Sequence, residues 1–369
     1  MMKSIRKVLI VQPYGIGDLL FLTPVLRAVR LLPSVEKVDL ILGSRTEAVV
    51  QGNPHIDEVF VIDKDLWHRQ SWSENFRFIK DLTQKLWREK YDLLLDYSQR
   101  SEYGFWAAVF LGIPRRAGFR SKRRGIFLNF PIPLKNGFSD FHVIDYDASV
   151  AERAGIPVVD RWMEYYVSDE DREQAKEFLQ KKFPNFPIGK YAVVSPGGGE
   201  SWGNDAHFKR WPVRFFAELL SRKILSDSTE VVFILGSAGE KALAEELRSL
   251  LKIPTFNLAG ECSLAQTAAL IEKSEFFLGN DGGLVHLAHA LKVPVVALYG
   301  PVDPKVYGPY PLSSRAERAQ RAQAIFKKDL ECRPCYQNFR YKSDCVHRAC
   351  LQELSVEEVT QNLSVSYKR

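Results

Sequence analysis

The sequence predicts an α/β protein that contains two doubly wound parallel sheets. Short apolar runs alternate with longer stretches of helical spacing, as they do where helices cover both faces of a parallel sheet. The alternation starts again in the second half of the chain, after a charged stretch and a break with two prolines near residues 160–188. A chain of 369 residues is long enough for two domains at about 100–200 residues each.

The first half is expected to alternate strands and helices. Strands are predicted at residues 8–11, 38–42, 59–62 and 92–96, because each is a short apolar run. Helical spacing covers residues 18–32, 73–88, 102–111 and 146–154. This order of elements is typical of a parallel sheet with crossover helices.

The second half repeats the pattern. Strands are predicted at residues 191–195, 231–235, 276–278 and 293–298, and helices at residues 212–225, 239–251 and 286–291. A charged helix at residues 169–183 precedes them, and a last helix runs from Ser355 to about Ser364. Ser355 and Glu358 have the spacing of a capping box at the start of that helix.

The net charge of +6 is concentrated in one stretch. Residues 115–139 hold seven basic residues and no acidic ones, and the rest of the chain carries 44 basic and 45 acidic residues. The stretch lies within no recognisable nucleic-acid motif, so it is either a solvated basic loop or part of a binding site. The 23 Phe, 14 Tyr and 7 Trp exclude disorder as the main state.

The sequence also indicates a compartment. No stretch reaches the ~18 consecutive apolar residues that a membrane-spanning helix needs. The apolar run at residues 8–11 is too short for a secretory signal, and we interpret it as the first strand. Cytoplasmic localisation is therefore expected.

The first motif with chemical potential is Gly15, Ile16, Gly17 and Asp18, between the first strand and the first helix. Glycines allow a sharp turn and close approach to a ligand. Asp18 has two interpretations from the motif alone. It can cap the helix, or it can act as a general base at the edge of the sheet where α/β proteins bind ligands.

Two further motifs could bind phosphate groups. Ser195 and Pro196 lead into glycines 197–199, and Lys209 follows shortly before a helix, an arrangement that can form a phosphate cradle. The third motif runs from Gly279 to His286 and enters a helix whose first N–H groups can bind an anion. Each motif also fits an ordinary loop.

The three motifs, in this order and at these separations, resemble glycosyltransferase family 9, the ADP-heptose:lipopolysaccharide heptosyltransferases. Residues 257–260 and 299–304 carry further parts of the resemblance, which covers nearly the whole chain. It implies a GT-B fold, in which two Rossmann-like domains face each other across a cleft. The expected N-terminal acceptor domain spans residues 1–168 and is joined by the C-terminal helix at 352–369, and the donor domain spans residues 169–351.

The resemblance also implies an inverting, metal-independent transfer of heptose from ADP-L-glycero-D-manno-heptose to the inner core of lipopolysaccharide. Asp18 then becomes the general base, and Gly15 and Gly17 line the acceptor site. The donor is expected to contact Ser195, Gly197, Gly198, Lys209, Glu240, Asp281, Gly282, Gly283 and His286. The chain departs from the family pattern at Gly282, where Ser or Thr is frequent, and at Gln12, where Arg is frequent.

The expected acceptor explains the basic stretch. A phosphorylated lipid acceptor at the inner membrane surface gives Arg120, Arg123 and Arg124 an anionic partner, so a cytoplasmic enzyme peripheral to that membrane is expected. The alternatives are a GT-B transferase with another nucleotide sugar or acceptor, and a relative that binds an ADP-sugar without transfer.

Four cysteines lie close together in the sequence. Cys332, Cys335, Cys345 and Cys350 could hold a structural zinc ion, pair as disulfides or remain free thiols. No cofactor is required for the expected reaction, and zinc is the less favoured alternative.

Overall fold

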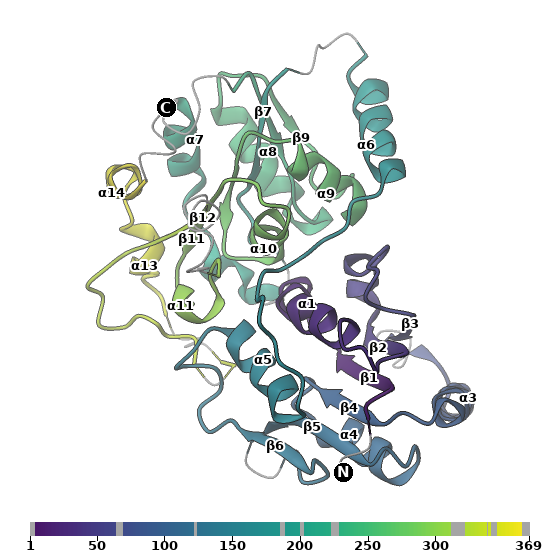
Figure 1. Ribbon diagram of the computed structural model, residues 1–369. Coiled ribbons are helices and arrows are strands. Elements are labelled where there is room, and N and C mark those ends of the chain that lie inside the picture. The colour runs from purple at the N-terminus through teal and green to yellow at the C-terminus, as the bar shows by residue number, and fades with distance from the viewer. Residues whose placement is uncertain are drawn as a thin grey trace. The chain divides into compact units, whose positions relative to one another are not determined.

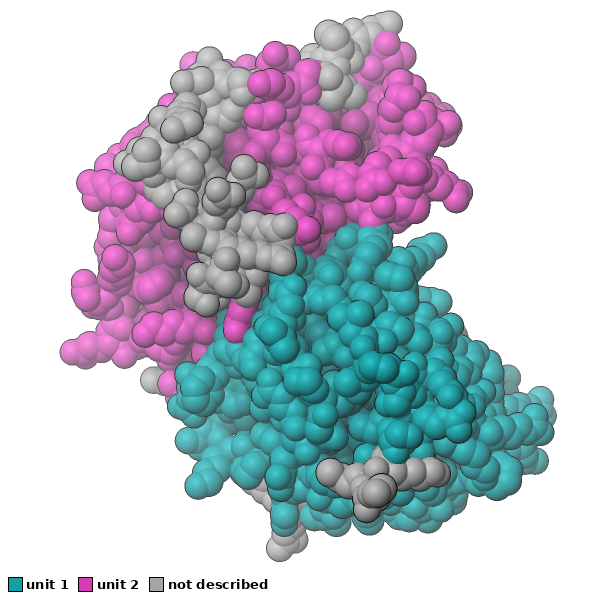
Figure 2. Space-filling view, in the orientation of Figure 1, with its two compact units in different colours: residues 1–166 teal, residues 167–369 magenta. Residues whose placement is uncertain are grey.

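The computed structural model describes residues 4–63, 69–121, 124–184, 189–199, 203–222, 229–310, 322–337, 339–340 and 345–363. The chain divides into two compact units, Met1–Tyr166 and Val167–Arg369 (Figure 2). This division falls two residues before the boundary that the sequence suggested. Among the described residues, no helix is long and apolar enough to cross a bilayer.

The first unit is built on a six-stranded sheet in the order β3-β2-β1-β4-β5-β6, and every neighbouring pair is parallel (Figure 1). Its strands are β1 (Lys7–Gln12), β2 (Lys37–Gly43), β3 (Glu58–Ile62), β4 (Leu93–Asp96), β5 (Arg115–Arg120) and β6 (Phe130–Pro133). The central strands β1 and β4 are almost entirely buried, because helices cover both faces.

Four α-helices and a short 3₁₀ helix, η1 (Ser44–Val49), connect these strands. The α-helices are α1 (Ile16–Arg30), α3 (Trp72–Glu89), α4 (Ser101–Val109) and α5 (Val143–Arg153). The helices α3 and α4 share one core cluster with Leu9 and Val11 of β1, and α1 contacts α5. Right-handed crossovers that leave β1 and β4 in opposite directions place α1 and α4 on opposite faces of the sheet.

The second unit repeats this architecture in the strand order β12-β11-β10-β7-β8-β9, again parallel throughout. The strands are β7 (Tyr191–Ser195), β8 (Val231–Ile234), β9 (Thr255–Asn257), β10 (Phe277–Asn280), β11 (Val295–Tyr299) and β12 (Ala322–Phe326). The fold class expected from the sequence, two Rossmann-like α/β units, is confirmed.

The α-helices of the second unit are α6 (Asp169–Lys182), α7 (Val213–Ser221), α8 (Lys241–Leu250), α9 (Leu264–Glu272), α10 (Gly283–Ala290), α11 (Pro304–Tyr307), α13 (Ala349–Gln352) and α14 (Val356–Asn362). Two 3₁₀ helices, η2 (Gly203–Lys209) and η3 (Ala238–Glu240), precede α7 and α8. Ser355 caps α14 through the capping box that the sequence predicted.

The C-terminal segment differs from its expected placement. Its described residues pack into the core of the second unit rather than joining the first: Leu351, Leu354 and Val359 are buried there, and the indole of Trp211 donates to the main-chain oxygen of Leu354 at 2.8 Å. The apolar side of α14 fits against α7 and β12, which explains this placement. Residues 364–369 lie outside the described part of the chain.

Part of the basic stretch forms a strand that the sequence did not predict. Residues Arg115–Arg120 are β5, in which Ala117 and Phe119 are buried, so a solvated loop is the wrong interpretation for these residues. Charged residues at the ends of the strand masked its apolar centre. The strands β6, β9 and β12 were also missed, since each is short or carries few strongly apolar residues.

The placement of the C-terminal segment is testable by stability. Leu351→Ala should lower the free energy of unfolding of the second unit by about 2–5 kcal/mol, because the Leu351 side chain is fully buried in its core. The control Val346→Ala removes a side chain that is 82% exposed and should change the stability by less than about 0.5 kcal/mol. Urea unfolding of both variants measures the difference, and equal small effects would contradict this packing.

Candidate active site

Each sheet has one position where loops can form a ligand site. In the first unit the chain leaves the adjacent strands β1 and β4 in opposite directions, and in the second unit it does so at β7 and β10. The loops that follow such a pair diverge and leave a crevice at the carboxyl ends of the strands, where open α/β sheets bind ligands. The three sequence motifs follow β1, β7 and β10, so all of them lie at these two positions.

Asp18 lies in the first turn of α1, directly beyond β1. Gly15 is the N-cap, and its N–H donates to Oδ2 of Asp18 at 3.0 Å. Asp18 therefore does contribute to the cap of α1. It is the third residue of the helix, and its side chain accepts from the N–H of the N-cap residue Gly15. The side chain is half-buried, so the bond orients the carboxylate without removing it from solvent.

The loop after β4 meets the loop after β1. Tyr14 donates its hydroxyl to the main-chain oxygen of Ser98, and the Asp96 carboxylate accepts from the Ser98 N–H at 2.9 Å and hydroxyl at 2.5 Å. Burial raises the pKa of Asp96 to about 6, although the Ser98 bonds oppose the shift. A third carboxyl, Asp147 of α5, is also buried, and its burial together with the charge of Asp18 raises its pKa well above the ordinary value.

Two arginines bring positive charge to this group. Burial raises the pKa of Tyr14, and the charges of Arg100 and Arg124 oppose that shift, whereas those of Asp18 and Asp96 reinforce it. Arg124 of the basic stretch therefore lies within electrostatic reach of the same tyrosine as Asp18. Arg120 is exposed at the end of β5. Arg123 lies outside the described residues.

Arg116 belongs to the fold rather than to a binding surface. Its guanidinium donates to the main-chain oxygens of Phe127, at 2.7 Å, and of Ile113, at 2.5 Å. These two bonds tie the loop after β5 to the start of that strand. Not every arginine of the basic stretch is therefore available to an anionic ligand.

In the second unit, the glycine turn after β7 is held by Glu240. One carboxylate oxygen accepts from the Gly199 N–H at 2.8 Å, and the other accepts from the Ser237 N–H at 2.8 Å. A Cβ atom at position 197 would lie 1.9 Å from Glu240, and Gly198 has a φ of +77°, so only glycine fits both places. Glu240 thus fixes the shape of the turn.

Lys209 and Asp281 form a buried ion pair beside this turn. Their Nζ and Oδ2 atoms are 2.7 Å apart, and their side chains are 8% and 5% exposed. Asn280 links the surrounding loops, because its side chain accepts from the Trp211 N–H at 3.1 Å and donates to the Pro196 oxygen at 2.6 Å. The second and third motifs therefore form one site.

The start of α10 contacts the glycine turn closely. A Cβ atom at position 282 would lie 2.3 Å from the main-chain oxygen of Gly198. A serine or threonine at this position would force the turn to move, which gives a physical reason for the glycine of this chain. Gly283 is the first residue of α10, and Ser195 and His286 are both buried at this end of the sheet.

No disulfide joins the four clustered cysteines, all of which lie in the described part of the chain, and burial raises the pKa of Cys350 to about 12, with a smaller contribution from Cys335. Over the part of the chain that the structure describes, no three or more His, Cys, Asp or Glu side chains are grouped as metal ligands. This search includes the four cysteines.

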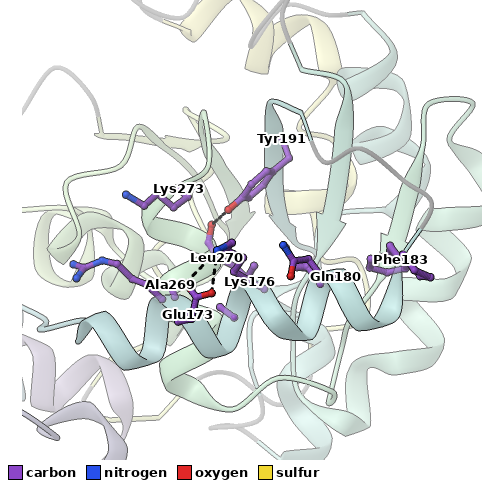
Figure 3. A pocket seen from close by; sticks show the side chains of 12 residues that line it. Glu173, Lys176, Gln180, Phe183, Tyr191, Ala269, Leu270 and Lys273 are labelled. Carbon is purple, nitrogen blue, oxygen red and sulfur yellow. Dashed lines mark hydrogen bonds and ion pairs between the residues drawn. The ribbon is translucent and has the colours of Figure 1, made fainter.

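A separate pocket of about 540 Å³ lies between α6 and α9 (Figure 3). Among its lining residues, Tyr191 begins β7 and donates its hydroxyl to the main-chain oxygen of Leu270 at 2.8 Å. The pocket therefore lies at the edge of the sheet opposite to Ser195, which ends β7. It contains none of the predicted site residues.

Comparison with known proteins places these features in a family. Residues 79–336 match the model of glycosyltransferase family 9 (heptosyltransferase). The chain belongs to glycosyltransferase family 9. Its strands and loops therefore form the scaffold of a sugar transferase.

Relatives agree with this assignment. The chain is 26% identical over 318 residues to lipooligosaccharide heptosyltransferase 2 of Haemophilus influenzae, covering 84% of this chain and 87% of that protein. The structure of Escherichia coli ADP-heptose lipopolysaccharide heptosyltransferase II matches with a TM-score of 0.69 and 22% identity over 96% of both chains. E. coli heptosyltransferase WaaC with ADP matches with a TM-score of 0.61 and 22% identity, over 82% of this chain and 90% of that one.

Several residues of the site have no signal in the sequence. Asp96 ends a predicted strand and was not singled out, and Asp147 lies inside a helical pattern that gives no reason to select it. The ion pair of Lys209 with Asp281 joins two motifs that are separate in the sequence. Only the parallel pairing of β7 with β10 brings them together.

The raised pKa of Asp96 predicts a dependence of stability on pH. The folded protein binds this proton up to about pH 6, and the unfolded chain releases it near pH 4, so stability is lost as the pH rises through this window. The Asp96→Asn variant has no carboxyl to ionise at this position, so its stability should not fall as the pH rises. At pH 7.5 its free energy of unfolding should exceed that of the wild type by up to about 3 kcal/mol.

Urea unfolding at pH 4 and pH 7.5 tests this, and the advantage should shrink toward pH 4. Ser98→Ala should have the opposite effect, because it removes a hydrogen bond that favours the ionised Asp96 carboxylate. The pKa of Asp96 should then rise further, and the decrease in stability should continue to a higher pH. An advantage of Asp96→Asn that is equal at both pH values would contradict the shift.

Proposed function

We propose that this protein transfers heptose, with inversion at the anomeric carbon, from ADP-L-glycero-D-manno-heptose to the inner core of lipopolysaccharide. The observation that carries the proposal is the buried Lys209–Asp281 pair beside a rigid glycine turn, in a chain of glycosyltransferase family 9. A lysine held in place at the crevice of an α/β sheet suits the diphosphate of a nucleotide sugar.

On the donor side, Lys209 contacts the diphosphate, and the N–H groups of Gly198, Gly282 and Gly283 surround it. Asp281 is negatively charged and would repel a phosphate, so we assign it to orient Lys209 rather than to touch the donor. Glu240 braces the glycine turn, and its proposed contact with the nucleoside or sugar adds to that role. Ser195 and His286 line the same pocket.

The reaction itself needs a base and a stabilised leaving group. Asp18 takes the proton of the acceptor hydroxyl as its oxygen forms the new bond to the anomeric carbon, while the bond from that carbon to ADP breaks and ADP keeps the electron pair. Lys209 and the first N–H groups of α10 stabilise the charge that grows on ADP. ADP is also the nucleotide in the solved E. coli heptosyltransferase of similar fold.

The acceptor is proposed to bind the first unit. Gly15 and Gly17 allow a sugar to approach Asp18, and Arg120, Arg123 and Arg124 bind anionic groups of the core or lipid A. Such an acceptor is anchored in lipid, so the enzyme works at the membrane surface from the cytoplasmic side. The second candidate is another nucleotide sugar as donor, because Lys209 and the glycine turn would bind the diphosphate that all nucleoside diphosphate sugars share.

The deciding experiment incubates the full-length protein with ADP-heptose and a panel of truncated core acceptors. ADP release coupled to an acceptor mass increase of one heptose is the expected result. ADP-heptose binding without transfer to any acceptor would favour a binding-only relative, and transfer from another nucleotide sugar alone would replace the proposed donor.

The roles of Asp18 as cap and as base can be separated. Asp18→Asn keeps an oxygen that can accept from the Gly15 N–H but cannot take a proton, so helix α1 should remain intact. We expect kcat to fall by at least about 10²-fold, with little change in the dissociation constant for ADP-heptose or in Tm. Turnover that survives in Asp18→Asn would show that another group is the base.

Lys209 is expected to bind ADP directly. Lys209→Met should weaken ADP binding and lower kcat by about 10²-fold, but it also leaves Asp281 buried without its partner and costs about 3–5 kcal/mol of stability. The double variant Lys209→Met with Asp281→Asn removes both charges and should recover stability without recovering ADP binding.

Titration calorimetry with ADP and thermal unfolding measure the two effects. Lys292→Met, beyond the opposite end of α10, is the matched control and should bind ADP as the wild type does. Wild-type affinity for ADP in the stable double variant would show that Lys209 does not contact the donor.

A further inference from the structure

The first unit exposes an unusual concentration of large apolar side chains. Over the part of the chain that the structure describes, eight of the fourteen exposed large apolar residues lie between Trp72 and Ile126. The most exposed of them are Trp72 at 81%, Phe76 and Ile126 at 58%, Val109 at 57% and Phe110 at 54%. The other six are spread singly along the chain. Soluble proteins rarely expose so many apolar residues in one region unless it is an interaction surface.

These side chains lie on two neighbouring helices and the loop beside them. Trp106 of α4 donates its indole N–H to Thr83 of α3 at 2.9 Å, so the helices lie side by side on one face of the sheet. Phe105 of α4 contacts Phe127 of the loop after β5, with ring centroids 5.1 Å apart, and Phe110 at 5.8 Å. We call the outward side of α3, α4 and residues 124–128 the α3–α4 face.

The helix α3 has two apolar sides with different roles. Leu82 and Leu86 face inward and are buried in the core of the unit. Trp72 and Phe76, one turn apart, stack on each other with ring centroids 5.6 Å apart and remain open to solvent. Folding of the unit therefore accounts for the inward side and leaves the outward aromatic pair without a structural task.

The charge around this face is positive. Residues 69–90 hold six basic and three acidic residues. The described residues 101–121 and 124–126 hold four basic residues, of which Arg116 is bonded within the fold, and one acidic residue, Glu102. Exposed arginines and lysines stand among the apolar side chains, and Lys90 lies 3.4 Å above the ring of Trp87. Aromatic and aliphatic groups interspersed with cations fit the boundary layer of an anionic bilayer, because the apolar groups enter the headgroup region and the cations attract the lipid phosphates.

We propose that the α3–α4 face docks the protein on the surface of an anionic phospholipid bilayer. A bilayer is favoured over a protein partner because the face combines aromatic groups with an excess of positive charge, which complements anionic headgroups. One end of α4 lies near the candidate base, since Arg100 is the N-cap of α4 and its charge acts on Tyr14 in the loop that leads to Asp18. That the docked bilayer carries the acceptor rests on the proposed function, whereas bilayer binding itself does not.

The test measures binding of the full-length protein to vesicles by co-sedimentation, without donor or acceptor. Vesicles of about one part phosphatidylglycerol to two parts phosphatidylcholine should bind it, and high salt or phosphatidylcholine alone should weaken binding at least about tenfold. The double variant Trp72→Ser with Phe110→Ser should lose at least about tenfold in affinity for the anionic vesicles at unchanged Tm.

The matched control is Phe141→Ser, an aromatic residue of the same unit that is 63% exposed and precedes α5, the helix that packs with α1. It should bind vesicles as the wild type does. The proposal is overturned if the wild-type protein does not bind anionic vesicles, or if the double variant binds them as the wild type does. A concentration-dependent dimer that the double variant abolishes would assign the face to a second copy instead and would also overturn it.

A kinetic comparison connects the face to the reaction. The double variant should transfer heptose to a lipid-free core oligosaccharide as the wild type does and should lose rate only on acceptor embedded in vesicles. Equal losses on both acceptors would contradict a docking role. If no heptose is transferred by any variant while vesicle binding still depends on Trp72 and Phe110, the proposed function fails and the docking surface stands.

Discussion

Both units depend on one topological constraint, the divergence of the chain at a central pair of parallel strands. Right-handed crossovers that wind outward in opposite directions from β1 and β4, and from β7 and β10, leave the carboxyl ends of these strands uncovered. The loops there cannot pack under a helix and must satisfy their own polar groups. The hydrogen bonds from Gly15 to Asp18, from Ser98 to Asp96 and from Gly199 to Glu240 all serve this need. The same carboxylates that complete the fold thereby become fixed points of the candidate sites.

How far the sequence predicts this arrangement depends on the range of the interactions involved. Strand and helix order follows from local periodicity, and the glycine motifs follow from backbone requirements, so both were predicted. The roles of Asp18 and Lys209 follow from the family resemblance and stay predictions. The strand β5 was missed because its terminal arginines hide the buried Ala117 and Phe119. The pairing of Lys209 with Asp281, the gathering of Asp96 and Asp147 near Asp18 and the docking of α14 on the second unit join residues far apart in the chain. Local patterns contain no information on such contacts.

The buried charges of the second unit restrict what its crevice can bind. Removing Lys209 and Asp281 from water is costly, and their attraction repays the cost only while the pair stays intact. An anion that binds Lys209 has little further desolvation cost at the lysine, because folding has already buried that side chain. The nearby charge of Asp281 repels the same anion. The braced glycine turn adds N–H donors in a fixed geometry. A ligand that reaches Lys209 and the turn together is therefore favoured over a small single anion.

The same fixed partners determine which kind of phosphate suits the proposed donor site. A monophosphate can contact Lys209 or the N–H groups at the start of α10, but it carries few oxygens to reach both and to offset the repulsion by Asp281. A diphosphate spans a longer distance with more charge, so one phosphate can meet the lysine while the other meets the helix. Because Glu240 holds the glycine turn rigid, the gap between these partners is set before the ligand arrives. Fixed partners on two sides of the ligand, rather than the strength of any single contact, thus support the proposal of a nucleoside diphosphate sugar as donor.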